Sequence, residues 1–259
     1  MRKIQVNGKA IADGKAPLVC TPLVGRTREA LAAEVGTIVP KRPDVVEWRV
    51  DFFGNLGDVA EVVTAAGELR AALGGIPILF TRRAAHEGGE KNGVAEERVL
   101  EVYDAVCARR AVELVDYELS NSVGNLRRVR DAARANGVTL VASFHDFQRT
   151  PPAEELFQKF RSMQEAGADV AKIAVMPEKL EDVLTLLAAT LRADRELEVP
   201  LISMSMGPFG SLTRMFGWVF GSALSFGVGK AASAPGQVPI EDLDAAVAIL
   251  RRALGSKAP

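Results

Sequence analysis

An alternation of short apolar runs with longer helix-like segments, repeated eight times, constrains the fold of this chain more than any other feature of its sequence. Each run is rich in Val, Ile, Leu and Phe, which is typical of a strand buried on both faces. Each is followed by turn residues and a segment with the helical spacing of apolar residues. The strand-like runs are residues 17–24, 45–53, 76–83, 112–119, 139–147, 169–176, 200–206 and 223–228.

This count predicts one (β/α)8 TIM barrel that spans residues 1–259 as a single domain. An open doubly wound sheet is the alternative, but it normally has fewer strands and a glycine-rich turn after the first strand. Residues 22–26 lack the GxGxxG spacing of such a turn. Residues 1–15 contain Asn7-Gly8 between two short strand-like runs, so we expect an N-terminal β-hairpin that closes the bottom of the barrel.

The helix-like segments indicate which side chains pack against the barrel. Leu156, Phe160 and Met163 share one face of a segment that ends at Gly167, a residue type that commonly terminates helices. The same spacing predicts two further buried faces, one formed by Leu180, Val183, Leu184, Leu187 and Leu191, and the other by Leu243, Val247, Leu250 and Leu254.

Composition excludes several classes of function. The chain has 32 basic and 33 acidic residues, so it has no overall field that would recruit nucleic acid or an anionic membrane. We expect a small-molecule substrate instead. The first residues lack the apolar core of a signal peptide, and no run is long and apolar enough to cross a membrane. Cys20 and Cys107 lack metal-site or redox spacing, which favours a cytoplasmic location.

Lys172 lies in the middle of the apolar run at residues 169–176. An ammonium group in a buried strand costs several kcal/mol unless it is paired or loses its charge. The side chain could extend along the core so that the ammonium reaches water at the strand end, which is common for a lysine. Alternatively, burial favours a neutral amine that attacks a carbonyl carbon and forms a Schiff base. This run alone leaves both interpretations open.

Charged residues alternate with apolar ones in the second strand-like run. In residues 46–52 the apolar positions form one face, and the other face carries Glu47 and Arg49. In a closed barrel the apolar face packs against the helices, so these two charges are expected in the lumen, as a paired network or as ligand contacts. Strand parity in the third run directs Arg83 inward, and the loop after it contains Glu87.

The fourth and fifth runs add Asp116, Glu118 and His145. The two carboxylates share one face, and we interpret them as partners in a structural charge network. A histidine at a strand end is usually a hydrogen-bonded rim residue. Consecutive parallel strands lie about 4.8 Å apart, however, so His145 and Lys172 could converge on one ligand. A base beside an amine suits Schiff-base formation followed by proton abstraction next to the former carbonyl.

Two later segments suggest ligand contacts. Residues 210–214 predict the start of a helix with Arg214 in its first turn, where backbone N–H groups and a guanidinium would together bind a carboxylate or a phosphate. A solvated arginine on a helix is the alternative. Residues 231–237 are small, polar and uncharged, which suits a loop that closes over a ligand.

Taken together, these residues resemble the type I 3-dehydroquinate dehydratases of the shikimate pathway. The matching segments follow the order of that family along nearly the whole chain, and they are residues 47–51, 81–90, 143–147, 171–174, 203–207, 220–222 and 233–237.

The resemblance implies a barrel, commonly a homodimer, that dehydrates 3-dehydroquinate to 3-dehydroshikimate in aromatic amino acid biosynthesis without a metal or an organic cofactor. It implies that Lys172 forms the Schiff base, that His145 is the general acid and base, and that Glu87 orients the histidine. It also implies a set of substrate-binding and pocket-lining residues, namely Glu47, Arg49, Arg83, Arg214, Ser233, Gln237, Met204 and Met206.

The sequence departs from the family pattern at two places. Residues 207–210 lack charged side chains, and His86 stands before Glu87 where another basic residue is common. Two rival functions remain, a class I Schiff-base aldolase and a non-catalytic relative that binds a quinate-like ligand. Aldolases usually act on phosphorylated substrates, and the glycine loop of a phosphate site after the last strands is not evident here.

Overall fold

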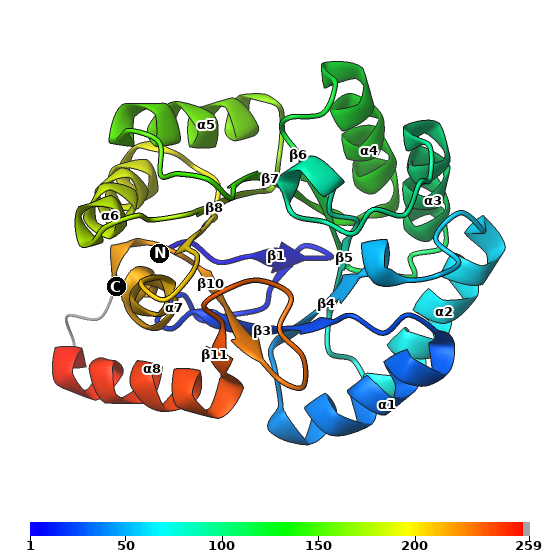
Figure 1. The fold of residues 1–259 in the computed structure, drawn as a ribbon, viewed down its shortest axis with the longest axis horizontal. Helices are drawn as coiled ribbons and strands as arrows, with labels where there is room; N and C mark the ends of the chain where they lie inside the picture. Colours follow the sequence, from blue (N-terminus) through cyan, green and yellow to red (C-terminus); the bar gives the residue numbers. More distant parts are fainter. Residues whose placement is uncertain (256–259) are drawn as a thin grey trace.

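The structure is a computed structural model, and it describes residues 1–255. Parallel strands curl into a barrel with helices on the outside (Figure 1), which confirms the predicted fold class. The expected domain of residues 1–259 extends to residues 256–259, which lie outside the described residues. The barrel strands are β3 (Leu18–Leu23), β4 (Val45–Arg49), β5 (Ile78–Thr81), β6 (Leu114–Glu118), β7 (Thr139–Asp146), β8 (Val170–Val175), β9 (Leu201–Ser205) and β10 (Leu224–Val228).

Helices connect these strands and cover the outer face of the barrel. No helix in residues 1–255 is both long and apolar enough to span a membrane. The α-helices are α1 (Arg28–Ile38), α2 (Val59–Ala72), α3 (Glu96–Ala108), α4 (Val123–Asn136), α5 (Ala153–Glu165), α6 (Leu180–Glu196), α7 (Gly210–Phe216) and α8 (Ile240–Leu254). Short 3-10 helices are η1 (Val39–Lys41), η2 (Val50–Phe52), η3 (Ala85–Glu87) and η4 (Gly217–Phe220).

The sheet runs in chain order from β3 to β9, and β10 returns to pair with β3. The barrel closes between β9 and β10 through one bridge, Leu201 with Ser222, and through the N–H of Ala223, which donates to the carbonyl of Leu201 at 2.7 Å. A further short strand, β11 (Val238–Pro239), pairs in parallel with β10 and was not expected from the sequence. It ties the segment before α8 to the edge of the barrel.

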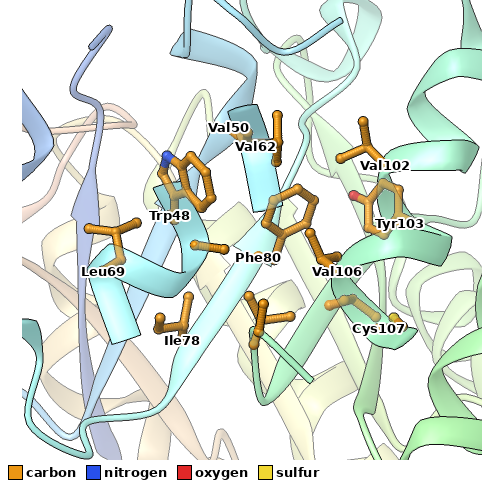
Figure 2. Close-up of a cluster of buried hydrophobic side chains, with 14 of the residues drawn as sticks. Trp48, Val50, Val62, Leu69, Ile78, Phe80, Val102, Tyr103, Val106 and Cys107 are labelled. Carbon is orange, nitrogen blue, oxygen red and sulfur yellow. The ribbon is translucent and has the colours of Figure 1, made fainter. Parts of the chain in front are cut away.

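Aromatic side chains of β4 and β5 show which residues of these strands point outward, towards the helices. Trp48 of β4 and Phe80 of β5 are fully buried and pack edge to face, with ring centroids 5.5 Å apart. Figure 2 shows them among side chains of α2 and α3, including Tyr103, whose ring centroid lies 5.3 Å from that of Phe80. Because side chains alternate along a strand, the neighbouring Glu47 and Thr81 point to the lumen.

The N-terminal residues form the expected hairpin. β1 (Gln5–Val6) pairs with β2 (Lys9–Ala10) across a turn in which Asn7 and Gly8 both have positive φ, as tight hairpin turns require. The side chain of Ile4 is fully buried. It belongs to the same apolar cluster as the first inward-facing residues of the barrel strands, so the hairpin closes the bottom; that cluster includes Leu79, Leu114, Val141 and Val170.

Two local expectations were wrong. The run at residues 45–53 leaves strand geometry after Arg49 and turns into η2, which brings Asp51 back beneath the guanidinium of Arg49. In α6, Leu180 and Leu184 are 53% and 64% exposed instead of buried. The buried face of α6 is formed by Leu186 and four residues smaller than leucine, namely Val183, Ala189, Thr190 and Ala193.

Candidate active site

Lys172 of β8 lies in the barrel lumen and is 3% exposed. Its Nζ lies 2.9 Å from Oδ2 of Asp116 and 3.3 Å from Oε1 of Glu47, and it stands 4.7 Å from the ring centre of Phe226. The ammonium therefore does not extend to water, and two carboxylates compensate for its burial. The first interpretation, an ammonium that reaches water at the strand end, was therefore wrong, and the role of Lys172 as a nucleophile stays a prediction.

Asp116 was expected to be only a structural partner, yet it joins Lys172 to the rest of the charged network. Its carboxylate also accepts hydrogen bonds from Arg83 at 2.8 Å and from Ser143 at 2.6 Å. Burial alone would raise the pKa of Asp116, but Arg83 and Lys172 hold it well below its usual range. Position parity on β6 was the one sequence signal that could have placed Asp116 in the site.

Glu118 has a more structural role, as the sequence indicated. It accepts hydrogen bonds from Arg83 at 3.0 Å, from the backbone N–H of Ala84 at 2.8 Å and from Asn121 at 2.8 Å. These contacts anchor Arg83 and the start of the loop after β5. Burial opposes the charge of Arg83, but Asp116 and Glu118 together raise its pKa, so it stays a guanidinium.

His145 stands two residues beyond Ser143 on β7, and Ser143 is the strand partner of Lys172. Its Nδ1 lies 3.0 Å from Oε2 of Glu87, which also accepts the backbone N–H of His145 at 2.9 Å. This pairing leaves Nε2 as the ring nitrogen available to a ligand. Burial lowers the pKa of His145 well below its ordinary value, and the positive charges of Arg83 and Lys172 add to the effect.

Two glycines explain how Glu87 reaches the lumen. Gly88 has φ +85, and a Cβ there would lie 2.3 Å from the ring of Phe147. A Cβ on Gly89 would lie only 1.9 Å from the carbonyl oxygen of Arg83. The chain after η3 can therefore turn back tightly against β5, which keeps Glu87 buried. That burial raises the pKa of Glu87 to about 7.

The predicted environment of Arg214 was wrong. α7 has seven residues, and Arg214 lies in its last turn, not beside its N-terminus. The helix begins against the end of β9, where the N–H of Ser205 donates to Oγ1 of Thr213 at 2.9 Å, so Arg214 enters the site from one turn further on. Within residues 1–255 the Arg214 guanidinium has no carboxylate partner, and burial lowers its pKa to about 10. No group in the part of the chain that the structure describes accepts a hydrogen bond from its buried Nε, which suits an anionic ligand.

The segment at residues 231–237 covers the mouth of the barrel. Arg49 donates to the carbonyl of Ser233 at 3.2 Å, and Arg214 donates to the carbonyl of Pro235 at 3.2 Å. Gln237 accepts the N–H of Ser233 at 2.9 Å, which shapes the segment into a tight loop. This placement agrees with the expected closing loop.

One cavity with about 420 Å³ of empty space brings together all the predicted site residues. They are Lys172, His145, Glu87, Glu47, Arg49, Arg83, Arg214, Ser233, Gln237, Met204 and Met206. Sequence reasoning missed other lining residues, chiefly Phe147, Ala174, Phe226 and Ala234. Their apolar side chains carry no chemical signal in a sequence, so only their position reveals them.

Three of the carboxylates in or beside this site, those of Glu47, Asp116 and Glu118, are already paired with cations. Within residues 1–255, no group of three or more His, Cys, Asp and Glu side chains is arranged to hold a metal ion. Glu47 and Asp116 pair with Lys172, and Glu118 pairs with Arg83. The expectation that the reaction needs neither a metal nor a cofactor stays a prediction.

Comparisons with known proteins agree on one family. A family model described as type I 3-dehydroquinase matches residues 19–253. The 3-dehydroquinate dehydratase of Albidiferax ferrireducens is 54% identical over 254 residues, covering 98% of this chain and 96% of that protein. That of Aromatoleum aromaticum is 53% identical, covering 98% and 97%. The crystal structure of 3-dehydroquinate dehydratase from Geobacillus kaustophilus superimposes with a TM-score of 0.92 at 42% identity, covering 97% of each chain.

Proposed function

The chain belongs to the type I 3-dehydroquinase family, and on that premise we propose that it dehydrates 3-dehydroquinate through a Schiff base on Lys172. The enzyme is a hydro-lyase. The main observation that supports this mechanism is the buried amine of Lys172, which lies between Asp116 and Glu47. His145 lies on the adjacent strand, β7.

Lys172 starts the reaction by attacking the ring ketone. To do so, its ammonium gives one proton to neutral His145, and the free amine adds to the carbonyl carbon. The imidazolium then returns that proton to the departing oxygen, so the net products are a protonated imine and one water, and charge and atoms balance. Asp116 and Glu47 stay beside the positive nitrogen throughout, which lowers the energy of the cationic imine. The imine then withdraws electrons from the neighbouring carbon and acidifies its C–H bond.

His145 moves the proton in the next two steps. Neutral Nε2 removes the proton from the carbon beside the imine, and the electron pair forms an enamine. The enamine then expels the hydroxyl group two carbons from the imine carbon, and the imidazolium returns its proton to that oxygen, so water leaves. A second water hydrolyses the conjugated imine and releases 3-dehydroshikimate and Lys172. The lowered pKa of His145 supports this assignment, because it keeps the ring neutral at physiological pH.

Substrate binding is assigned to the remaining side chains of the cavity. Arg214, which pairs with no carboxylate among the described residues, is the residue for the substrate carboxylate. Arg49, Arg83 and Glu47 face the ring from the barrel strands, and Ser233 and Gln237 contact hydroxyl groups from the closing loop. Met204 and Met206 form the apolar wall.

Borohydride trapping tests the mechanism. Borohydride added during turnover of 3-dehydroquinate should reduce the imine and leave an irreversible adduct on Lys172, which peptide mass spectrometry locates. Lys172→Ala should form no adduct and no product, whereas His145→Ala should lose turnover and keep some adduct. Absence of the adduct in the wild-type enzyme, or equal loss of adduct in both variants, would contradict the assigned roles.

Two activity measurements separate the rival functions from a dehydratase. A class I aldolase would consume added aldehyde acceptors, and a non-catalytic relative would produce no enone absorbance. Neither rival gains support from a feature of the cavity.

We also propose that the enzyme is a cytoplasmic homodimer of aromatic amino acid biosynthesis, which rests on the resemblance to its family. Two buried free thiols, Cys20 and Cys107, support a reducing compartment. Sedimentation velocity tests the assembly, since the chain mass is 27.7 kDa and a dimer has twice that value.

A further inference from the structure

The loop after β5 separates two hollows. Residues 82–89, called here the β5 wall, contribute Glu87 and Gly88 to the active-site cavity. On its other side the wall contributes Ala85 and His86 to a second, open hollow at the protein surface. The two histidines of the chain, His145 and His86, therefore lie on opposite sides of this wall.

An unbroken series of hydrogen bonds crosses the β5 wall between these histidines. Nδ1 of His145 lies 3.0 Å from Oε2 of Glu87. The other carboxyl oxygen, Oε1, is hydrogen bonded to Oγ of Ser120, and that hydroxyl lies 3.2 Å from Nε2 of His86. Glu87 is 2% exposed, whereas Ser120 and His86 are exposed to solvent.

The orientation of His145 does not by itself explain this arrangement. Both contacts from His145, the ring nitrogen and the backbone N–H, meet the same oxygen of Glu87. The second oxygen points away from the catalytic site and towards Ser120. The Ser120 hydroxyl already provides the hydrogen bond that the buried carboxyl of Glu87 needs. It nevertheless also contacts His86, a residue type that can gain or lose a proton.

Access to His145 from the mouth of the barrel is narrow. The His145 side chain is 8% exposed, and residues 231–237 already lie across the mouth through their contacts with Arg49 and Arg214. A substrate in the cavity would cover Nε2, so Nδ1 and Glu87 are the remaining direction in which a proton can leave His145.

We propose that Glu87, Ser120 and His86 form a proton relay that connects His145 with bulk water while the cavity is occupied. The inference rests on the proposed role of His145. In the outward step His145 starts as the imidazolium that carries the abstracted proton on Nε2. The proton on Nδ1 passes to Oε2 of Glu87, the carboxyl proton on Oε1 passes to Oγ of Ser120, and the hydroxyl proton passes to Nε2 of His86, so that His145 becomes neutral with its proton on Nε2. Only N–H and O–H bonds form and break, and Glu87 begins and ends as a neutral carboxyl group. His86 then releases its proton to water.

The ionisation of Glu87 agrees with this step. Burial raises the pKa of Glu87 to about 7, so both its neutral and its charged forms are populated near neutral pH. When Glu87 is ionised, Ser120 donates to Oε1. When it is neutral, the carboxyl donates to Ser120 and the serine can donate to His86, which is the state the relay uses.

Exchange of the His145 ring proton tests the relay directly. Enzyme labelled with 15N-histidine is reacted with 3-dehydroquinate and borohydride, so that the reduced adduct fills the cavity, and exchange of Nδ1–H with water is measured by NMR. With 2 histidines in the chain, the spectrum is readily assigned. We expect Ser120→Ala and His86→Ala to slow the exchange by about tenfold or more, since each removes a positioned proton-transfer group.

Three controls separate a relay from a structural effect. Ser120→Thr keeps the hydroxyl and should exchange like the wild type, and Ser162→Ala, on the exposed face of α5, should change nothing. Added imidazole should restore exchange in His86→Ala, because it can enter the open hollow, but not in Ser120→Ala. Equal exchange in the wild type and both alanine variants, or no rescue by imidazole, would overturn the relay. If the wild type forms no adduct, the proposed function fails instead.

Discussion

Lys172 and Asp116 show how the lumen compensates for charge at the level of single residues. The ammonium has two carboxylate neighbours, and Asp116 is shared with Arg83 and Ser143. Buried charges need such partners, because an unpaired ion in the interior costs several kcal/mol. The same contacts hold Nζ in one place, which favours attack on a bound ketone.

Asp116→Asn tests whether this contact serves the reaction. A hydrogen bond to a charged group contributes about 1.5–3 kcal/mol, so we expect borohydride trapping and kcat to fall roughly tenfold to hundredfold. Glu118→Gln is the matched control, because Glu118 contacts Arg83 but not Lys172. The control should lower the free energy of unfolding and leave the rate of adduct formation close to that of the wild type. Equal trapping rates in the two variants would refute a direct role for Asp116.

Glu87→Gln tests whether burial raises the pKa of the Glu87 carboxyl group. Burial raises the pKa of Glu87 from 4.5 to about 7 in the folded protein. A raised pKa contributes stability that is present below the unfolded value and is lost as pH rises through the folded value. The wild type should therefore lose about 2.5 kcal/mol of unfolding free energy relative to Glu87→Gln between about pH 5 and about pH 8. Denaturant titrations at both pH values measure this difference, and parallel pH profiles would contradict it.

At the level of elements, the closing loop depends on a glycine that touches the loop after β9. Gly236 has φ +79, and a Cβ there would lie 2.1 Å from the carbonyl oxygen of Gly207. Gly8 in the hairpin has φ +75, but a Cβ there would meet nothing within 4 Å. An alanine would have a strained backbone at both positions, but only at position 236 would its Cβ clash with another residue.

Gly236→Ala and Gly8→Ala make use of this difference. Both variants should lose about 1–2 kcal/mol of stability, because an alanine at positive φ is strained. Only Gly236→Ala should also raise KM for 3-dehydroquinate, since the clash moves the loop that carries Ser233 and Gln237. Melting temperatures and steady-state kinetics measure both effects. An unchanged KM in Gly236→Ala would show that the loop does not position those side chains.

At the level of the whole molecule, the barrel is weakest where it closes. Between β9 and β10 the hydroxyl of Ser222 replaces some of the backbone hydrogen bonds that would otherwise join the two strands. It accepts the N–H of Ser203 at 3.0 Å and lies 3.3 Å from the carbonyl of Leu224. This side chain is buried, so its loss would leave a backbone N–H unsatisfied.

Ser222→Ala should therefore destabilise the closure of the barrel. The unsatisfied N–H costs about 1–3 kcal/mol, and amides of β9 and β10 should exchange faster with solvent than those of β4 to β8. Hydrogen exchange and denaturant unfolding measure this. Ser162→Ala on the surface of α5 serves as the reference, and uniform acceleration across all strands would argue against a local opening.

Much of the architecture was readable from the sequence, because periodicity follows from local geometry. Apolar runs set the strands, helical spacing set most of the helices, and alternation along β4 and along the run that contains β5 set which residues face the lumen. The hairpin followed from Asn7-Gly8, whose turn geometry needs no tertiary contact. Lys172 and His145 were found in the same way, since each interrupts an apolar run with a polar side chain, whereas Glu87 lies in a loop and its role followed only from the family resemblance.

Other features were decided only by packing in three dimensions. The buried face of α6 is one, because apolar residues lie on two adjacent faces of this helix and only the surface of the barrel selects between those faces. The place of Arg214 in the last turn of α7 follows from how that helix abuts β9. The contacts of Asp116 with Lys172, and of His86 with Ser120, join residues far apart in the chain. Periodicity specifies the face of an element, whereas the pairing of charges across the lumen depends on strand register and side-chain reach, which exist only once the barrel has closed.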